Sequence, residues 1–163
     1  MMNLIVAVDE NWGIGKDGDL LHPISTDLKN FRRLTTGNVI VMGRKTLESF
    51  PKKKPLPNRV NIVLTGNKDY PAEGIVLCHD PKDLPALLAQ YGEQEIFVVG
   101  GGSIYRQLLP LCEKAYVTHI RASYPADTFF PDLAADPAWT LTEAGEVQEE
   151  DGVAFSFDLY ERR

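Results

Sequence analysis

The sequence contains few of the features that mark specialised classes of protein. Its 163 residues include only two cysteines, Cys78 and Cys112, which disfavours a disulfide framework and favours a reducing, cytoplasmic setting. No apolar run approaches the roughly 18–20 residues that a membrane helix needs, so we expect no membrane partner. Residues 1–13 lack the basic lead and the long apolar core of a signal peptide.

Positive charge and metal-binding patterns are also scarce. Lys and Arg number 17 against 23 Asp and Glu, a net charge of −6, and because nucleic-acid binders normally carry a basic face we expect no nucleic-acid partner. The histidines His22, His79 and His119 show no metal-ligand spacing, so we expect no metal. With 44% hydrophobic and 25% charged residues, the composition is that of a globular protein, and residues 1–163 fit one domain with its own core.

Short apolar runs alternate with helical patterns along the first two thirds of the chain. Five runs are rich in β-branched residues and continuously apolar, which predicts strands covered on both faces: Asn3–Val8, Val39–Met42, Val60–Leu64, Ile75–Cys78 and Ile96–Val99. Apolar residues at helical spacing predict helices over Asp27–Leu34 and Leu84–Tyr91. A third helix is expected up to Leu109, with Ser103 as its N-cap.

The last third predicts antiparallel strands. Ala115–Ile120 reads as a strand, Ala154–Tyr160 alternates apolar and polar residues, and Asp151-Gly152 is a hairpin-turn signal. The chain is therefore predicted to be an α/β domain whose mostly parallel sheet ends in an antiparallel hairpin. Ligands of such sheets bind beyond the carboxyl ends of the strands, which directs attention to the residues after Val8, Met42, Leu64, Val99 and Ile120.

A glycine motif near the N-terminus does not fit a dinucleotide fingerprint. Residues Gly13–Gly18 match G-x-G-x-x-G, but the four residues Asp9–Trp12 separate them from the preceding strand, and Pro23 interrupts the segment that should be a helix. A long loop over a ligand is the favoured interpretation.

Two later turns are better candidates for a phosphate site. Gly43-Arg44-Lys45-Thr46 follows one predicted strand and precedes a helix, where free N–H groups and basic side chains suit an anion, although a solvated basic turn is an even alternative. Gly100–Gly102 lets the backbone approach a ligand closely, although glycines also permit tight strand–helix packing. Two such turns after two strands indicate one extended polyphosphate, as in a dinucleotide.

Two charged residues stand beside the predicted core. Asp27 opens the first helix, where it is either an acid favoured by the helix dipole, the better reading of this segment alone, or a buried functional carboxylate. Arg59 precedes a strand and is either a surface charge, the usual case, or a fork for a ligand carboxylate.

Six collinear segments give the whole chain a resemblance to the dihydrofolate reductase family: LIVAVDENWGIGKDGDL, the helix from Asp27 to Phe31, VIVMGRKTLES, PLPNRVNIVLT, FVVGGGSIY and AYVTHI. The resemblance implies an eight-stranded, mainly parallel mixed sheet with a C-terminal antiparallel hairpin and about four flanking helices. It also implies hydride transfer from NADPH to C6 of dihydrofolate, with protonation at N5, by a monomer.

The resemblance assigns the substrate-binding residues. Asp27 is similar to the family's active-site carboxylate, which pairs with the 2-amino group and N3–H of the pterin, and Thr118 to the threonine that bonds this carboxylate. Arg59 is similar to the arginine that holds the α-carboxylate of the glutamate tail. The remaining substrate contacts implied are Ile5, Val6, Ala7, Leu20, Leu28, Phe31, Phe50, Leu56, Val99 and Tyr105.

The cofactor-binding residues follow from the same resemblance. The residues implied for the phosphates are Gly43, Arg44, Lys45, Thr46, Gly100, Gly101, Gly102, Ser103, Ile104 and Tyr105, with Val99 before them. The residues implied for the adenosine end are Leu64, Thr65, Gly66, Asn67 and His79. Ala7, Ile14, Gly15, Asp19 and Leu20 are implied near the nicotinamide, with Gly13–Leu20 as a closing loop.

Three positions depart from the family pattern. His22 replaces a tryptophan that commonly supports a water near the pterin, Ser103 stands where arginine is frequent, and Gly66 stands where serine or arginine is frequent. A related reductase acting on a ribosylated aminopyrimidine, and a non-catalytic pterin- or nucleotide-binding module, are the alternative functions.

Overall fold

The computed structural model describes residues 2–16, 19–20 and 23–163, with no account of the side chains of 19–20. The main sheet contains β1 (Met2–Val8), β4 (Val39–Gly43), β5 (Val60–Leu64), β6 (Val76–Cys78), β7 (Ile96–Gly100), β8 (Lys114–Ile120), β10 (Trp139–Ala144), β11 (Gln148–Glu150) and β12 (Val153–Arg162). The helices are α1 (Ser25–Thr35), α2 (Arg44–Ser49), α3 (Leu84–Leu88) and α4 (Gly102–Leu108). Short 3-10 turns cover Pro51–Lys53, Pro81–Asp83, Ala89–Tyr91 and Leu109–Leu111.

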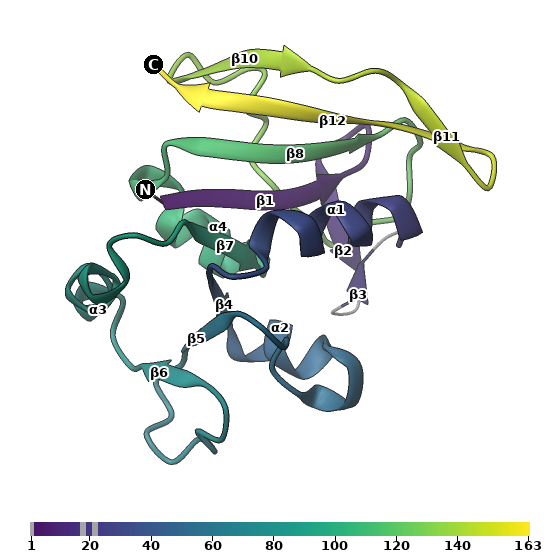
Figure 1. Cartoon of the computed structure of the whole chain (residues 1–163). Helices are drawn as coiled ribbons and strands as arrows, with labels where there is room; N and C mark the ends of the chain where they lie inside the picture. Colours follow the sequence, from purple (N-terminus) through teal and green to yellow (C-terminus); the bar gives the residue numbers. More distant parts are fainter. Residues whose placement is uncertain (1, 17–18, 21–22) are drawn as a thin grey trace.

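The sheet confirms the predicted mixed architecture. Its strands lie in the order β10-β12-β8-β1-β7-β4-β5-β6, and β11 pairs with β12 as a ninth strand (Figure 1). The pairs from β8 through β1, β7, β4 and β5 to β6 are parallel, whereas β12 runs antiparallel to β8, β10 and β11. The predicted hairpin turn is confirmed, because Asp151 and Gly152 have the positive φ angles, 53° and 78°, that a tight two-residue turn requires.

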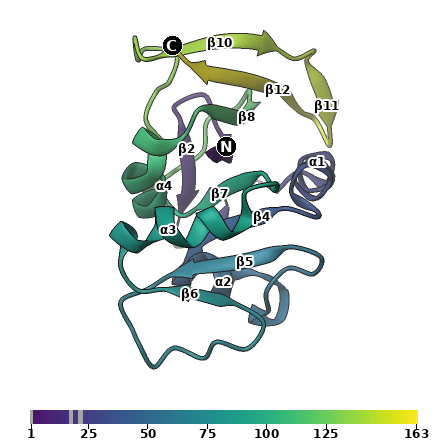
Figure 2. The same cartoon turned by 60° about the vertical axis from the view of Figure 1, so that its left-hand side comes forward.

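Helices cover both faces of the sheet, which explains the continuous apolarity of its central strands. Side chains of α3 and α4 pack on one face, with Leu84 and Leu108 in the largest buried cluster. On the other face, Leu47 of α2 and Phe31 of α1 pack with a second cluster. Figure 2 shows α3 and α4 on the opposite side of the sheet from α1. With both faces covered, all four residues Val39–Met42 of β4 are fully buried.

The predicted loop over Gly13–Leu20 is wrong in part, because the described residues of this segment form strands. β2 (Gly13–Lys16) pairs antiparallel with β3 (Asp19–Leu20) and with β9 (Thr128–Phe129), giving a separate three-stranded sheet. The pairing with β9 joins residues more than a hundred positions apart, so the local sequence could not indicate it.

One helix boundary and one helix face also differ from the prediction. Ser103 is not the N-cap of α4: Gly101 holds that position, and Ser103 lies inside the helix, where its hydroxyl accepts a hydrogen bond from Gln107. Leu28 was expected on the apolar face of α1, but it is 49% exposed. The buried side of α1 instead follows Asp27, Phe31 and Leu34, spaced four and three residues apart.

Candidate active site

A half-buried acid, Asp27, lies between α1 and the sheet. The Thr118 hydroxyl donates a hydrogen bond of 2.6 Å to Oδ1 of Asp27, across 91 residues of chain. Thr118 is 3% exposed and pairs with Ala7, so the acid faces the carboxyl ends of β1 and β8. Burial raises the pKa of Asp27, and the hydrogen bond from Thr118 opposes that rise. The structure therefore brings the two predicted catalytic residues together, and the functional role of Asp27 stays a prediction.

The raised pKa of Asp27 predicts that this acid costs stability. The folded state holds the Asp27 proton more tightly than the unfolded state does, so the free energy of unfolding falls as pH rises above the ordinary value of 3.8. We expect Asp27→Asn to be more stable than the parent chain at neutral pH, because an amide has no charge to desolvate. Urea titrations should show this gain shrinking to nothing in acid below pH 3.8. A gain that is the same at every pH would contradict the assignment.

Most of the predicted apolar substrate contacts gather on one face of the sheet. Ile5 lies in the second cluster, and the half-buried side chains packed against that cluster include Phe31, Phe50, Leu56 and Val99. Three predicted contacts lie elsewhere. Val6 points to the opposite face, into the largest cluster, Ala7 packs with a third cluster around Ile24 and Phe155, and Leu28 is exposed.

Arg59 lies half-buried at the edge of this apolar cluster. Its Nε donates to the carbonyl of Pro57 at 3.0 Å, and its Nη1 donates to the Thr35 hydroxyl at 3.1 Å. Burial, followed by the nearby charge of Arg32, lowers the pKa of Arg59, which remains a cation at neutral pH. These contacts fix the guanidinium at the end of α1, one helix length from Asp27.

The two glycine-bearing turns meet, as the hypothesis of a single polyphosphate requires. A Cβ added to Gly101 would lie 3.5 Å from the Thr46 hydroxyl, and one added to Gly43 would lie 3.0 Å from Ile104. β4 and β7 are neighbours, so both turns leave the same edge of the sheet. Gly100 has a φ of 123°, which only glycine adopts readily. The residues present therefore fit a phosphate chain lying against bare backbone and a hydroxyl.

This fit predicts the effect of one added methyl group. Gly101 has an ordinary extended backbone, φ −84°, so Gly101→Ala should fold, with a free energy of unfolding close to that of the parent. The methyl group would occupy space beside Thr46 and raise the NADPH dissociation constant about 5- to 150-fold, the equivalent of about 1–3 kcal/mol of overpacking. Fluorescence titration measures this, with Gly92→Ala as the control, directly after the 3-10 turn that precedes β7, where the nearest atom to the new Cβ lies 3.8 Å away. Equal affinities in both variants would contradict the site.

The side chain of Tyr105 is buried beneath the glycine-bearing turn that follows β7. It is 6% exposed, its hydroxyl donates to the carbonyl of Ile5 at 2.7 Å, and its ring lies under Gly100. Burial raises the pKa of Tyr105, and the charge of Asp27 adds to the rise. Tyr105 thus ties α4 to β1 between the acid and the glycine turn, and it contributes to the site chiefly by holding backbone in place.

The predicted adenosine-end residues lie along the same edge of the sheet. Gly43 pairs with Leu64 across β4 and β5, which places Arg44 near Thr65, and the Nδ1 atom of His79 lies 3.0 Å from the Thr65 carbonyl. Four further predicted cofactor residues are exposed. Two follow β5, namely Gly66 and Asn67, and the other two are Lys45 on α2 and Ser103 on α4.

Arg44 has partners that the sequence reading missed. Its Nη1 donates to both carboxylate oxygens of Glu48, at 3.0 and 3.2 Å, and the Tyr70 hydroxyl donates to the same carboxylate at 2.9 Å. The hydrogen bond from Tyr70 is the main cause that lowers the pKa of Glu48, ahead of those from Arg44. The spacing of Arg44 and Glu48, four residues apart on a helix, was the available signal.

The β2 segment reaches the glycine turn of β7. A Cβ on Gly102 would lie 2.6 Å from Thr128 of β9 and 3.8 Å from Ile14 of β2. Gly15 pairs with Leu20 and Thr128. Asp19 and Leu20 are described only by their place in β3, and His22 lies outside the described residues.

A buried carboxylate that the sequence reading missed organises this segment. Asp9 is 1% exposed and accepts hydrogen bonds from the backbone N–H groups of Asn11, Gly13 and Tyr124. These bonds tie the start of β2 to the chain that follows β8.

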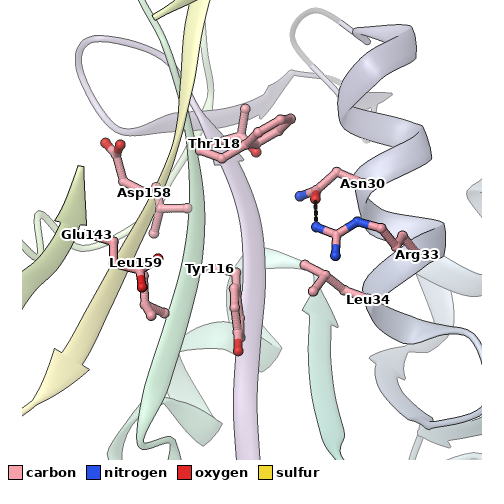
Figure 3. A pocket seen from close by; sticks show the side chains of 10 residues that line it. Asn30, Arg33, Leu34, Tyr116, Thr118, Glu143, Asp158 and Leu159 are labelled. Atoms are coloured by element: carbon pink, nitrogen blue, oxygen red, sulfur yellow. Dashed lines mark hydrogen bonds between the residues drawn. The ribbon is translucent and has the colours of Figure 1, made fainter. Parts of the chain in front are cut away.

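A cavity of about 160 Å³ lies between α1 and the strands β8 and β12, as Figure 3 shows. Its lining comprises Asn30, Arg33, Leu34, Tyr116, Val117, Thr118, Glu143, Phe157, Asp158 and Leu159. Thr118 is the one predicted site residue among them, so this cavity does not coincide with the predicted substrate slot. Within the described part of the chain, no group of three or more His, Cys, Asp and Glu side chains could hold a metal ion.

The structure is an α/β domain in which two glycine-bearing turns meet at the carboxyl ends of neighbouring parallel strands. The family model described as dihydrofolate reductase matches residues 1–162. The dihydrofolate reductase of Bacillus subtilis is 36% identical, over 100% of this chain and 95% of that one, and the enzyme of Drosophila melanogaster is 39% identical, over 98% and 97%. A solved structure of the Enterococcus faecalis dihydrofolate reductase, complexed with NADP(H) and RAB-propyl, superposes with a TM-score of 0.85 at 35% identity, covering 100% of this chain and 96% of that one. The chain belongs to the dihydrofolate reductase family.

Proposed function

We propose that this chain reduces 7,8-dihydrofolate to 5,6,7,8-tetrahydrofolate with NADPH. The observation that carries the proposal is the hydrogen bond between the half-buried Asp27 and the buried Thr118, which lies at the carboxyl ends of the strands, where the two glycine-bearing turns also emerge. One acid and two adjoining glycine-bearing turns suit a reaction in which the protein supplies alignment and charge, and a cofactor supplies the reducing electrons.

Asp27 would bind the pterin through charge-assisted hydrogen bonds to its 2-amino group and N3–H. Thr118 holds Oδ1 of Asp27, which leaves Oδ2 free of that bond to face a ligand. A carboxylate with a raised pKa can accept and release a proton closer to neutral pH than an ordinary one, so Asp27 would favour protonation of the pterin at N5 without bonding to N5 itself. Ile5, Phe31 and Phe50 would exclude water from the reacting rings.

When bound, NADPH supplies a hydride for C6 of dihydrofolate. Thr46 and the backbone of Gly100–Gly102 would hold its phosphates, and Arg44 would add positive charge beside Thr65 and His79 at the adenosine end. Because Glu48 already binds one Nη atom of Arg44, the remaining guanidinium N–H groups would meet the 2′-phosphate.

The direct test is the absorbance of NADPH at 340 nm with dihydrofolate as the acceptor. We expect oxidation that requires dihydrofolate and is faster in kcat/KM with NADPH than with NADH. Faster oxidation with a ribosylated aminopyrimidine would favour the related riboflavin-pathway reductase. Binding of both ligands without turnover would favour a non-catalytic module.

We infer further that residues 1–163 act as one domain, as a monomer in the cytoplasm, with no nucleic-acid or membrane partner. The acidic net charge of −6 supports the absence of a nucleic-acid partner. Among the helices that the structure describes, none has the length and apolar character to cross a bilayer.

A further inference from the structure

The helix that carries the acid begins without a capping side chain of its own. Ile24 holds the N-cap position of α1, where serine, threonine, aspartate or asparagine would normally accept a hydrogen bond from the first turn, and an isoleucine side chain has no acceptor. Asp27 is the third residue of this helix, so its position depends directly on how the first turn is held.

A carboxylate from the far end of the chain takes the place of the missing cap. Oε2 of Glu150 accepts a hydrogen bond of 2.8 Å from the Ser25 N–H, and Oε1 accepts one of 2.5 Å from the Thr26 hydroxyl. Glu150 ends β11, and Figures 1 and 2 both show the β11–β12 hairpin reaching the side of α1. The Ser25 N–H and the Thr26 hydroxyl each need an acceptor, and each bonds to a different oxygen of Glu150. A carboxylate is the side chain that offers two acceptor oxygens.

The hairpin is built to hold Glu150 in this place. Glu150 pairs with Val153 across the tight turn of Asp151 and Gly152. On the partner strand, Phe155 is 1% exposed and lies in the same buried cluster as Ile24, the residue before the helix. The hairpin therefore contacts the start of α1 twice, through an apolar cluster and through a hydrogen-bonded carboxylate.

We propose that Glu150 is a positioning residue for Asp27, acting through Ser25 and Thr26 to fix the first turn of α1 against Thr118. The inference rests on the proposed function, in which Asp27 binds the pterin. The hairpin thereby becomes part of the active site's support, although it is separated from Asp27 by more than a hundred residues.

The groups facing these two acids set the sign of the expected effect. Asp27 faces Thr118 of β8 and lies within electrostatic reach of Tyr105 of α4, while Glu150 interacts with the charge of Lys29 on α1. The cavity beside Thr118 adds Arg33 of α1 and, from the strands, Glu143 and Asp158. A loosened first turn would admit water to Asp27, and less desolvation means a pKa closer to its ordinary value.

Four substitutions in the full chain test this role. Glu150→Gln keeps the size of the side chain but leaves one of the two donors without an acceptor, and Thr26→Val removes a donor without changing any charge. Thr26→Ser restores the hydroxyl, and Glu149→Gln removes a neighbouring, exposed charge as the matched control. The primary measurement is the titration of the Asp27 carboxyl by carbon NMR with labelled aspartate, assigned by its loss in Asp27→Asn.

We expect the Asp27 titration to move to lower pH in Glu150→Gln and in Thr26→Val, and to stay in place in Thr26→Ser and Glu149→Gln. The kcat/KM for dihydrofolate should fall about 2- to 30-fold in the first two variants, as for a lost helix cap, with the NADPH dissociation constant unchanged. A shift in Glu150→Gln but not in Thr26→Val would overturn the positioning role, since charge alone would then act; so would equal titrations in all four. If the parent chain failed to reduce dihydrofolate, the proposed function would fail, and the NMR titration would still decide this inference.

Discussion

Replacing Asp27 by asparagine should lower kcat for dihydrofolate about 10²- to 10⁴-fold at neutral pH, the range expected when a positioned acid or base is lost. The amide is the same size and its oxygen still accepts the Thr118 hydrogen bond, so the fold and the NADPH site should persist. What the variant lacks is a negative charge for the pterin and a group that can exchange a proton.

The pH dependence of this loss makes the prediction specific. Protonated pterin brings its own proton, so the activity of the variant should rise as pH falls, while the activity of the parent chain should change less over the same range. Steady-state rates between pH 5 and 8 test this, with NADPH affinity measured in parallel. A kcat within twofold of the parent at neutral pH would remove Asp27 from the reaction.

Arg59→Leu should weaken dihydrofolate binding about 10- to 150-fold, which corresponds to the loss of about 1.5–3 kcal/mol from hydrogen bonds to a charged group. The substitution should not disturb folding, because the Thr35 hydroxyl still donates to the Phe31 carbonyl and the Pro57 carbonyl lies at an exposed turn. Arg59→Lys keeps the positive charge but not the planar guanidinium, so its affinity for dihydrofolate should lie between those of the parent chain and Arg59→Leu.

Dihydropteroate, which lacks the glutamate tail, is the control ligand for this prediction. If Arg59 binds the α-carboxylate, the leucine variant should bind dihydropteroate as well as the parent chain does. Equal losses for both ligands would mean that Arg59 acts on the pterin end or on the fold instead.

The strands were predictable from the sequence because their signal is local. Val60–Leu64 has the predicted bounds, and the other central strands differ by one residue at an end, since continuous β-branched runs can be buried only inside a covered sheet. The hairpin turn at Asp151-Gly152 was equally local, because few residue pairs adopt positive φ at both positions.

The contacts that complete the site were not predictable in this way. The strand β2 depends on β9, and the cap on α1 depends on Glu150, so in each case the partner lies over a hundred residues away. From the sequence alone, Glu150 is indistinguishable from an ordinary solvent-exposed charge in a hairpin. The prediction for Leu28 was wrong for a different reason. An apolar residue next to Asp27 could lie on either side of the apolar stripe of α1, and the sheet covers the side that carries Asp27 and Phe31, which leaves Leu28 exposed.

The glycine turns illustrate an intermediate case. Their position after β4 and β7 could be inferred from the sequence, but whether they touch depends on β4 and β7 being neighbours in the sheet. That adjacency turned two ambiguous segments into one site with Thr46 and Gly101 side by side. The role of each residue there stays a prediction until a ligand is seen bound.

A crystal structure of the chain with NADP⁺ and folate bound would test the central claim most directly. The account predicts the pteridine within hydrogen-bond distance of the Asp27 carboxylate, the nicotinamide ring beside it, and the pyrophosphate between Thr46 and Gly101. A pteridine bound away from Asp27, or a pyrophosphate that contacts neither turn, would contradict it.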